Sequence, residues 1–380
     1  MAGASVAGRS VLLPDGRLVP AVVEIDGATL AGVTPVTGEG ARDLPDRVVA
    51  PGFVDLQVNG HDDVDVAGAE GADWDRLDQL LLAQGVTAWC PTLVTAPLGS
   101  YGPALRRIEA AGRRTGPRPA VLGAHLEGPF LGGLTGAHDV SWVRPLDPDW
   151  LAALPPSVRI VTLGPELAGA PEAVALLADR GVVVALGHTA AGFDEAGRAA
   201  AAGARMVTHL FNAMSPLHHR EPGLVGAALT DPRLTPSLIA DLVHVHPAVV
   251  LAAFRARAGL GPGPGDPGVA LVTDAVGWRS GHVGGIGLRR REGDAPRRPD
   301  GTIAGSALTM DRAVANCVAV GVSPAAALAA ASLVPARLVG EVGRGRIEAG
   351  ARADLVVLSP DLGVLETWVG GDVAWRADGG

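Results

Sequence analysis

The sequence predicts a (β/α)8 barrel with a small β domain beside it. Apolar runs of strand length alternate with amphipathic segments, whose apolar residues recur every three or four positions and which close on glycine, as helices do. Eight such runs occur between residues 53 and 275, as a barrel requires. Polar residues gather at one end of the runs, whereas the other ends carry mostly Gly, Arg or Pro. In a barrel, this asymmetry indicates the carboxyl face, where active sites lie.

In chain order, the predicted strands are 53–59, 86–94, 120–127, 158–163, 182–188, 205–211, 237–244 and 269–275. The segments with the helical pattern include 74–85, 101–115, 170–181 and 193–204. Residues 279–303 are rich in Gly and Arg. They predict either a hairpin or flap near the exit of the eighth strand or a solvated loop.

Short alternating runs joined by Asp-Gly and Gly-Gly turns occupy both ends of the chain. Neither end is long enough to form a core by itself. We therefore expect residues 1–49 and 343–380 to pair into one small, discontinuous β-sandwich-like domain. Residues 50–342 then form the catalytic barrel.

Composition favours a small-molecule partner. The net charge of the 380-residue chain is −9, so no basic field attracts nucleic acid or an anionic membrane. Its 2 cysteines make neither a disulfide framework nor a CxxC metal site. The sequence shows no signal-peptide pattern and no apolar run long enough for a membrane helix. We therefore expect a cytoplasmic enzyme.

The chain contains no lysine, because all 31 of its basic residues are arginine. Schiff-base chemistry requires a lysine amine and is excluded. A metal pair bridged by a carbamylated lysine is excluded for the same reason. Any bound metal must be held by histidine, carboxylate, amide or water.

Four predicted strands end at residues suited to a metal-dependent hydrolase. Glu127, His188 and His209 form a set of ligands that zinc prefers. Asp274 supplies a carboxylate that can accept a proton from an activated water and later donate it. Each residue alone is more simply a cap or turn residue. Their position at the same edge of a barrel predicts one shared site.

The blocks PGFVDLQVNG, HLEGPF, GAH, GHT, THLFNAMSP, REPGLVGAAL, LVTDAVG and AGSALTMDRAV occur in this order. Through them the sequence resembles the N-acetylglucosamine-6-phosphate deacetylase family of amidohydrolases. The resemblance implies hydrolysis of the substrate's acetamide to an amine and acetate. It implies Glu127, His188 and His209 as ligands of one divalent metal, Zn²⁺ or alternatively Fe²⁺ or another ion. Asp274 would act first as the base and then as the acid, in a homodimer.

The same resemblance implies a set of substrate contacts. His138 would meet the substrate's carbonyl or sugar hydroxyls and help to stabilise the oxyanion. The sugar phosphate would meet the amides of Asn212 and Ala213. Its cationic partners would be Arg220 and His244, and some of these residues would come from the neighbouring subunit. The side chain of Met310 is expected either in the wall of the substrate cavity or in the core. The expected substrate contacts are His138, Asn212, Ala213, Arg220, His244 and Met310.

Gln57 and Asn59 stand where many amidohydrolases carry His-x-His for a second metal. Neutral amides are poor ligands for a transition metal, so the sequence predicts a single metal, with these amides orienting the water. His61 is an alternative ligand. The family pattern is also altered in 131–137 and 239–245, at the substrate end. Hydrolysis of another N-acylated sugar or amino acid therefore stays an alternative, as does a barrel that only binds.

Overall fold

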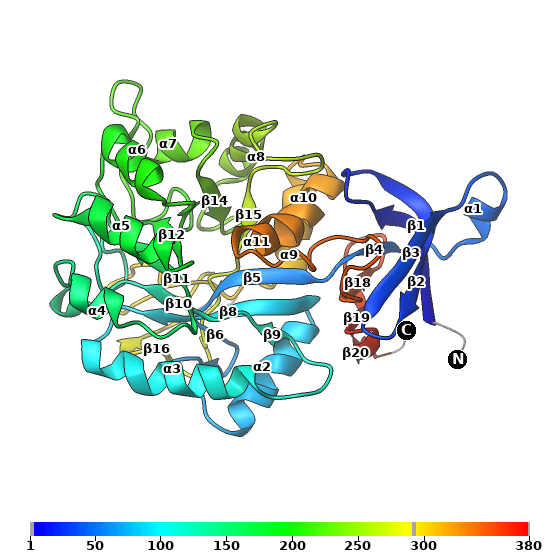
Figure 1. The fold of residues 1–380 in the computed structure, drawn as a ribbon, viewed down its shortest axis with the longest axis horizontal. Helices are drawn as coiled ribbons and strands as arrows, with labels where there is room; N and C mark the ends of the chain where they lie inside the picture. Colours follow the sequence, from blue (N-terminus) through cyan, green and yellow to red (C-terminus); the bar gives the residue numbers. More distant parts are fainter. Residues whose placement is uncertain (1–3, 291–293, 379–380) are drawn as a thin grey trace.

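The computed structural model describes residues 4–290 and 294–378, and its largest unit is a parallel barrel (Figure 1). Within these residues its eight neighbouring strands are β5 (Phe53–Val58), β8 (Val86–Val94), β10 (Ala124–Glu127), β11 (Val158–Leu163), β12 (Val183–Leu186), β13 (Met206–Val207), β14 (Thr235–Leu238) and β15 (Ala270–Leu271). The ring closes where the amide of Asp274 donates to the Gln57 carbonyl at 2.9 Å, and that of Asn59 to the Ala275 carbonyl at 2.8 Å. The predicted barrel is confirmed.

Helices surround the barrel because each turns an apolar face toward the strands (Figure 1). The predicted helices are present as α2 (Ala72–Leu82), α3 (Leu98–Gly112), α5 (Ala170–Asp179) and α6 (Phe193–Ala202). The others around the barrel are α4 (Pro148–Ala152), α7 (Gly223–Thr230), α8 (Pro247–Arg257), α9 (Met310–Ala319), α10 (Pro324–Ala331) and α11 (Leu333–Leu338), with a short 3₁₀ turn at Val140–Trp142. Among the described residues, no helix combines the length and apolar character needed to cross a membrane.

Four predicted strands differ in position, length or continuity. The sixth and eighth, predicted at 205–211 and 269–275, are only β13 (Met206–Val207) and β15 (Ala270–Leu271), because the backbone then leaves the extended conformation, with φ of 30° at His209 and 49° at Asp274. The predicted strand 120–127 is divided into β9 (Ala120–Val121) and β10, because the chain turns at Gly123, whose φ is 124°. The seventh strand, predicted at 237–244, is β14 at Thr235–Leu238. Its end was misplaced because Asp241 starts a turn, accepting the amides of the second and third residues that follow it.

The two ends of the chain pair in one antiparallel-rich sheet, shown in Figure 1 by neighbouring blue and red strands. In the described residues its order is β20-β19-β18-β4-β1-β2-β3, with β1 (Ala4–Leu12), β2 (Leu18–Asp26), β3 (Thr29–Pro35), β4 (Val48–Pro51), β18 (Leu355–Leu358), β19 (Val364–Val369) and β20 (Asp372–Arg376). A short helix, α1 (Gly40–Asp43), precedes β4. A separate apolar core contains Val11, Val23 and Leu355. We propose that the division between small domain and barrel runs near residues 50 and 342.

The Gly- and Arg-rich segment contains a hairpin of β16 (His282–Val283) and β17 (Ile286–Gly287), so the first of the two alternatives is correct. The hairpin's Val283 and Ile286 pack in a small apolar cluster with Val276, which precedes the segment. A second short hairpin, β6 (Gly60–His61) with β7 (Val64–Asp65), follows β5. Part of the predicted flap, residues 291–293, lies outside the described residues.

Candidate metal centre and active site

A cavity of about 300 Å³ opens at the carboxyl ends of the barrel strands. Residues of the β16–β17 hairpin form part of its wall. Of the residues predicted from sequence, those that line it are Asn59, Glu127, His138, His188, His209, Asn212, Ala213, His244 and Asp274. Most of the predicted site therefore converges on one cavity, although its members come from widely separated parts of the chain.

Glu127, His188 and His209 form the tightest cluster in this cavity. Oε1 of Glu127 lies 3.1 Å from Nε2 of His188 and 3.0 Å from Nε2 of His209. The two Nε2 atoms are 2.9 Å apart. All three side chains are nearly inaccessible to solvent. Three polar atoms thus converge on one point in a poorly solvated place, which is costly unless positive charge neutralises them.

The donor atoms of this cluster fit a metal ion. His188 Nδ1 donates to the Thr135 carbonyl at 3.2 Å, so in the neutral ring Nε2 carries a lone pair that faces Glu127 and His209. Ligands about 2.0–2.1 Å from a tetrahedral zinc are roughly 3.3 Å apart, close to the distances found here. A histidine whose far nitrogen donates to a backbone carbonyl is also typical of metal sites.

The backbone is strained where it presents three of these side chains. His188, His209 and Asp274 have φ values of 50°, 30° and 49°, in the left-handed region that side chains other than glycine rarely adopt. Such conformations cost about 1–3 kcal/mol each and concentrate at functional sites. Gly187 also permits a close approach, because a Cβ there would lie 3.0 Å from the Thr208 side chain. The fold thus accepts local strain to aim these groups into the cavity.

Asp274 is held by two side-chain amides, that of Gln57 on β5 and that of Asn59, which follows β5. Asn59 Nδ2 donates to Oδ1 of Asp274 at 2.7 Å, and Gln57 Nε2 donates to the same oxygen at 3.1 Å. Gln57 Nε2 also reaches Oε1 of Glu127, at 2.9 Å. The amides thus link the two carboxylates. Their NH₂ groups face anionic oxygens, which fits donors and not metal ligands.

The two carboxyl groups have pKa values displaced in opposite directions. Burial raises the pKa of Asp274 to about 8, and the Glu127 charge adds to this effect. Burial would raise the pKa of Glu127 as well, but the N–H donors and positive charge that the His188 and His209 rings carry when protonated outweigh it and hold that pKa well below its ordinary value. One carboxyl group is therefore poised to exchange a proton near neutral pH, while the other stays ionised.

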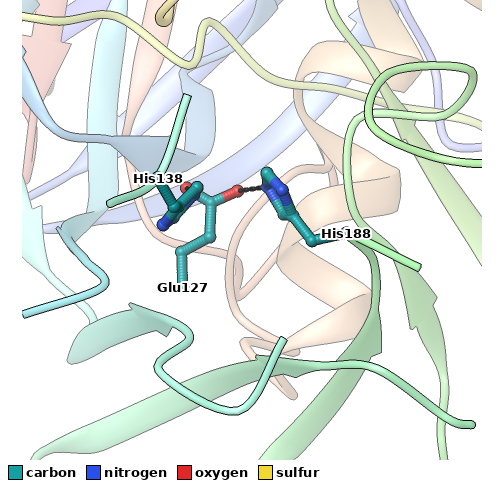
Figure 2. A group of neighbouring side chains, drawn as sticks. All are labelled: Glu127, His138 and His188. Carbon is teal, nitrogen blue, oxygen red and sulfur yellow. Dashed lines mark hydrogen bonds and ion pairs between the residues drawn. The ribbon is translucent and has the colours of Figure 1, made fainter. Parts of the chain in front are cut away.

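His138 approaches the cluster from the loop after β10. Figure 2 shows its ring beside Glu127 and His188, and the ligand atoms of these three residues lie within 4.8 Å of one another. Its Nε2 is 3.8 Å from Oε2 of Glu127, which is too long for a hydrogen bond. Its Nδ1 instead contacts Thr95. Burial lowers the pKa of His138 to about 3, so the ring is neutral.

Asn212, Ala213 and His244 line another part of the cavity wall. Asn212 Nδ2 donates to the His209 carbonyl at 3.1 Å, so Asn212 contacts the cluster of Glu127, His188 and His209 through the backbone. His244 Nδ1 contacts Asp241 Oδ2 at 2.6 Å. Asp241 also accepts the His244 amide at 2.8 Å, so this carboxylate fixes both the turn and the imidazole.

Three other residues proposed from sequence lie elsewhere. Arg220 is exposed, contacts His219 and does not line the cavity. Met310 is fully buried in the barrel core at the start of α9 and also does not line it, so the core alternative describes its position. His61 is not in the cavity lining, and its ring nitrogens have no hydrogen-bond partner among the described residues. Burial lowers the pKa of His61 to about 4.

Sequence reasoning missed Thr95 and Asp241, which hold the two histidines on the substrate side. Asp241 precedes His244 by three residues, and an aspartate at that spacing in a loop is a turn signal that was available. Thr95 contacts His138 from 43 positions away. No local pattern connects residues so far apart, so only the folded chain reveals that pair.

Residues 48–374 match the family described as "Amidohydrolase family". The chain belongs to the amidohydrolase family. Among its relatives, the N-acetylglucosamine-6-phosphate deacetylase of Homo sapiens is 40% identical over 366 residues, covering 89% of this chain and 86% of that protein. The N-acetylgalactosamine-6-phosphate deacetylase of Escherichia coli O157:H7 is 37% identical over 379 residues, covering 96% and 98%. This amidohydrolase therefore belongs with the amino-sugar-phosphate deacetylases, and the resemblance found in its sequence is confirmed.

Solved structures agree with this placement of the amidohydrolase. N-acetylglucosamine-6-phosphate deacetylase from Thermotoga maritima superposes with a TM-score of 0.87 at 29% identity, covering 98% of this chain and 100% of the other. A point mutant of the Mycobacterium smegmatis enzyme, in complex with N-acetyl-D-glucosamine-6-phosphate, superposes with a TM-score of 0.85 at 32% identity, covering 98% and 99%. The likeness extends over the small sheet as well as the barrel.

Proposed function

We propose that this protein hydrolyses the acetamide of N-acetylglucosamine-6-phosphate to glucosamine-6-phosphate and acetate. The observation that carries the proposal is the buried cluster of Glu127, His188 and His209 beside Asp274, in a chain 40% identical to a deacetylase of that name. A carboxyl group with a pKa near neutrality beside a cluster that fits a metal is suited to amide hydrolysis.

We assign Glu127, His188 and His209 as the ligands of one divalent ion per chain, with Zn²⁺ the ion that this set of nitrogens and oxygen suits. When bound, the ion supplies a Lewis acid that makes a water acidic enough to attack an amide at neutral pH. His138 is left out of the set, because its Nε2 is farther from Glu127 than are the other two nitrogens.

Asp274 carries the proton through the reaction. Its carboxylate accepts the proton of the attacking water, and its carboxylic acid later donates that proton to the departing nitrogen. Gln57 and Asn59 hold the Oδ1 atom of Asp274, which leaves Oδ2 for the proton. The positive charge of a nearby cation would lower the pKa of Asp274 from its raised value and so favour the ionised form that begins the cycle.

His138 serves the carbonyl oxygen of the substrate. A neutral imidazole with its Nε2 proton directed into the cavity can donate a hydrogen bond to the oxyanion that forms during attack. The low pKa of His138 keeps the ring neutral across the working range. The donor therefore adds no competing positive charge beside the ligand cluster.

The remaining wall would bind the sugar phosphate through Asn212, Ala213 and His244, with Arg220 as a further cation. Because Arg220 is exposed and outside the cavity of its own chain, we propose that it acts across the interface of a homodimer.

We also propose that the enzyme is cytoplasmic. Its two cysteines, both buried and free, are compatible with a reducing compartment.

The decisive experiment measures acetate release at fixed zinc from N-acetylglucosamine-6-phosphate and from unphosphorylated N-acetylglucosamine. A strong preference for the phosphorylated sugar supports the proposal. His244→Ala and Arg220→Ala should then raise KM for the phosphorylated sugar only. Equal rates on the two sugars would remove the phosphate-binding role, and no release from either would direct the search to other N-acylated sugars or amino acids.

A second candidate substrate is N-acetylgalactosamine-6-phosphate. It is favoured by the 37% identity, over 96% of this chain, to the Escherichia coli O157:H7 deacetylase named for that sugar. The two sugars differ only in the configuration at C4. The ratio of kcat/KM values for the two 6-phosphates, measured with one enzyme preparation, decides between them.

A further inference from the structure

Thr95, the first residue after β8, is completely buried against the ring of His138. Its backbone amide donates to Nδ1 of His138 at 3.2 Å, and its Oγ1 lies 2.8 Å from the same nitrogen. From these contacts we propose that Thr95 is a positioning residue for catalysis. It holds His138 in the tautomer whose proton is on Nε2, the nitrogen on the side of Glu127. The inference deepens the proposed deacetylation and rests on it.

The backbone amide decides the tautomer because it can only donate. A donor facing Nδ1 requires a lone pair there, so the proton of the neutral ring must be on Nε2. The other tautomer would set two N–H groups against each other at 3.2 Å inside a buried site, where an unmade hydrogen bond costs most.

The hydroxyl reinforces the same choice. With Nδ1 unprotonated, Oγ1 at 2.8 Å must donate to it, since two lone pairs at that distance would repel. Its alternative acceptor, the Glu127 carbonyl, is more distant at 3.3 Å. Gly128 keeps room for this hydroxyl, because a Cβ at that position would lie 2.2 Å from Oγ1.

Thr95 is the sole hydrogen-bond partner of the His138 ring within the described residues. Among the described residues, the carboxylate within ion-pair distance of this ring is that of Glu127, whose Oε2 is 3.8 Å from Nε2. That carboxylate therefore neither fixes the ring nor consumes the Nε2 proton. A substrate carbonyl entering the cavity would find a donor that is already oriented, which is what oxyanion stabilisation requires.

The first test observes the tautomer directly, without substrate. Zinc-loaded protein with ¹⁵N-labelled histidine is studied by NMR at neutral pH, and His138 is assigned from the signals missing in His138→Gln. We expect a pyridine-like Nδ1 and a protonated Nε2 in the wild type and in Thr95→Ser, which keeps the hydroxyl. Thr95→Val keeps the backbone amide and loses the hydroxyl, so the Nε2-protonated tautomer should stay the major form, while the Nδ1 signal shifts because one of its two donors is gone. Thr162→Val, which removes a buried hydroxyl from beside His125, is the matched control and should leave the His138 signals unchanged.

The second test is kinetic. Thr95→Val should lower kcat about tenfold, the value of one buried hydrogen bond, with KM within about twofold of the wild type. Thr95→Ser should restore most of kcat. A wild-type ring protonated on Nδ1 would overturn the proposal, as would an Nδ1 signal and a kcat that are both unchanged in Thr95→Val. The expected NMR result with no deacetylation of the phosphorylated sugar would instead refute the proposed substrate and leave the role of Thr95 in place.

Discussion

The two sides of the barrel mouth hold their carboxylates in different ways. Glu127 faces two imidazoles, His188 and His209, with contacts of 3.0–3.1 Å and with lone pairs that require positive charge. Asp274 faces the amides of Gln57 and Asn59, which donate to it and need no added charge. We propose that the Glu127 side binds the cation and that the Asp274 side holds the base. The neutral amides of Gln57, on β5, and Asn59, just after it, thus lie beside both carboxylates, and Gln57 Nε2 contacts each of them.

The contrast also explains why the pKa values of the two carboxyl groups diverge although both are buried. Burial acts in the same direction on both, raising each pKa. Imidazole partners outweigh burial at Glu127, whereas at Asp274 the Glu127 charge adds to burial, and the His209 charge and the Asn59 hydrogen bond lower the pKa too little to offset them. Both residues carry a buried carboxyl group, so the opposite shifts of their pKa values come from the groups that surround them.

Breaking the metal side should have the largest effect. His209→Asn removes one of the converging nitrogens, and we expect metal content to fall below one ion per chain and turnover to fall about 10⁴-fold or more, since activation of water is lost. Elemental analysis and acetate release measure both. His246→Asn changes an exposed histidine at the start of α8 and serves as the control. Full metal content in His209→Asn would exclude this residue as a ligand.

Breaking the base side should spare the metal. Asp274→Asn keeps the shape of the side chain and removes the proton acceptor, so turnover should fall roughly 10² to 10⁴-fold, the range for general acid–base catalysis. Metal content should stay at that of the wild type. Near-normal turnover would remove Asp274 from the mechanism and end the distinction between the two sides.

A smaller effect is expected when the amide support of Asp274 is weakened. Asn59→Leu removes a hydrogen bond to the ionised carboxylate, a bond that lowers its pKa, so the pKa of Asp274 should rise. Because the ionised form accepts the first proton, the acid limb of the kcat profile should move to higher pH. At neutral pH kcat should fall about 10- to 100-fold, the value of a hydrogen bond to a charged group.

The pH profile of Asn59→Leu is compared with that of Asn316→Leu, which removes a half-buried amide outside the cavity lining. That control should leave the acid limb in place. A limb that moves to lower pH in Asn59→Leu would contradict the supporting role of the amide.

The smallest effect is expected at Met310. Because this side chain is buried in the core and outside the cavity lining, Met310→Leu should leave KM and kcat within about twofold and cost less than about 1.5 kcal/mol of stability. Thermal unfolding and steady-state kinetics measure these two quantities. A large rise in KM would contradict this prediction and would indicate that Met310, at the start of α9, contacts the substrate.

Much of this protein was predictable from its sequence because the barrel repeats one local pattern. Strand runs and amphipathic helices each have their own period, and the two ends of the chain show the alternation of strands that must pair. For the same reason the sequence predicted that Glu127, His188, His209 and Asp274 lie together, since each ends an apolar run and parallel strands bring their carboxyl ends to one face.

Tertiary structure alone decided how those residues meet. The left-handed backbone at His188, His209 and Asp274 arises where short strands end in the ring, and no residue type at these positions announces it. The contact between Thr95 and His138 joins residues 43 positions apart, and the exposure of Arg220 depends on how its loop leaves the barrel. Periodicity records which face a residue occupies, whereas hydrogen bonds and pKa shifts depend on neighbours that only the folded chain brings within reach.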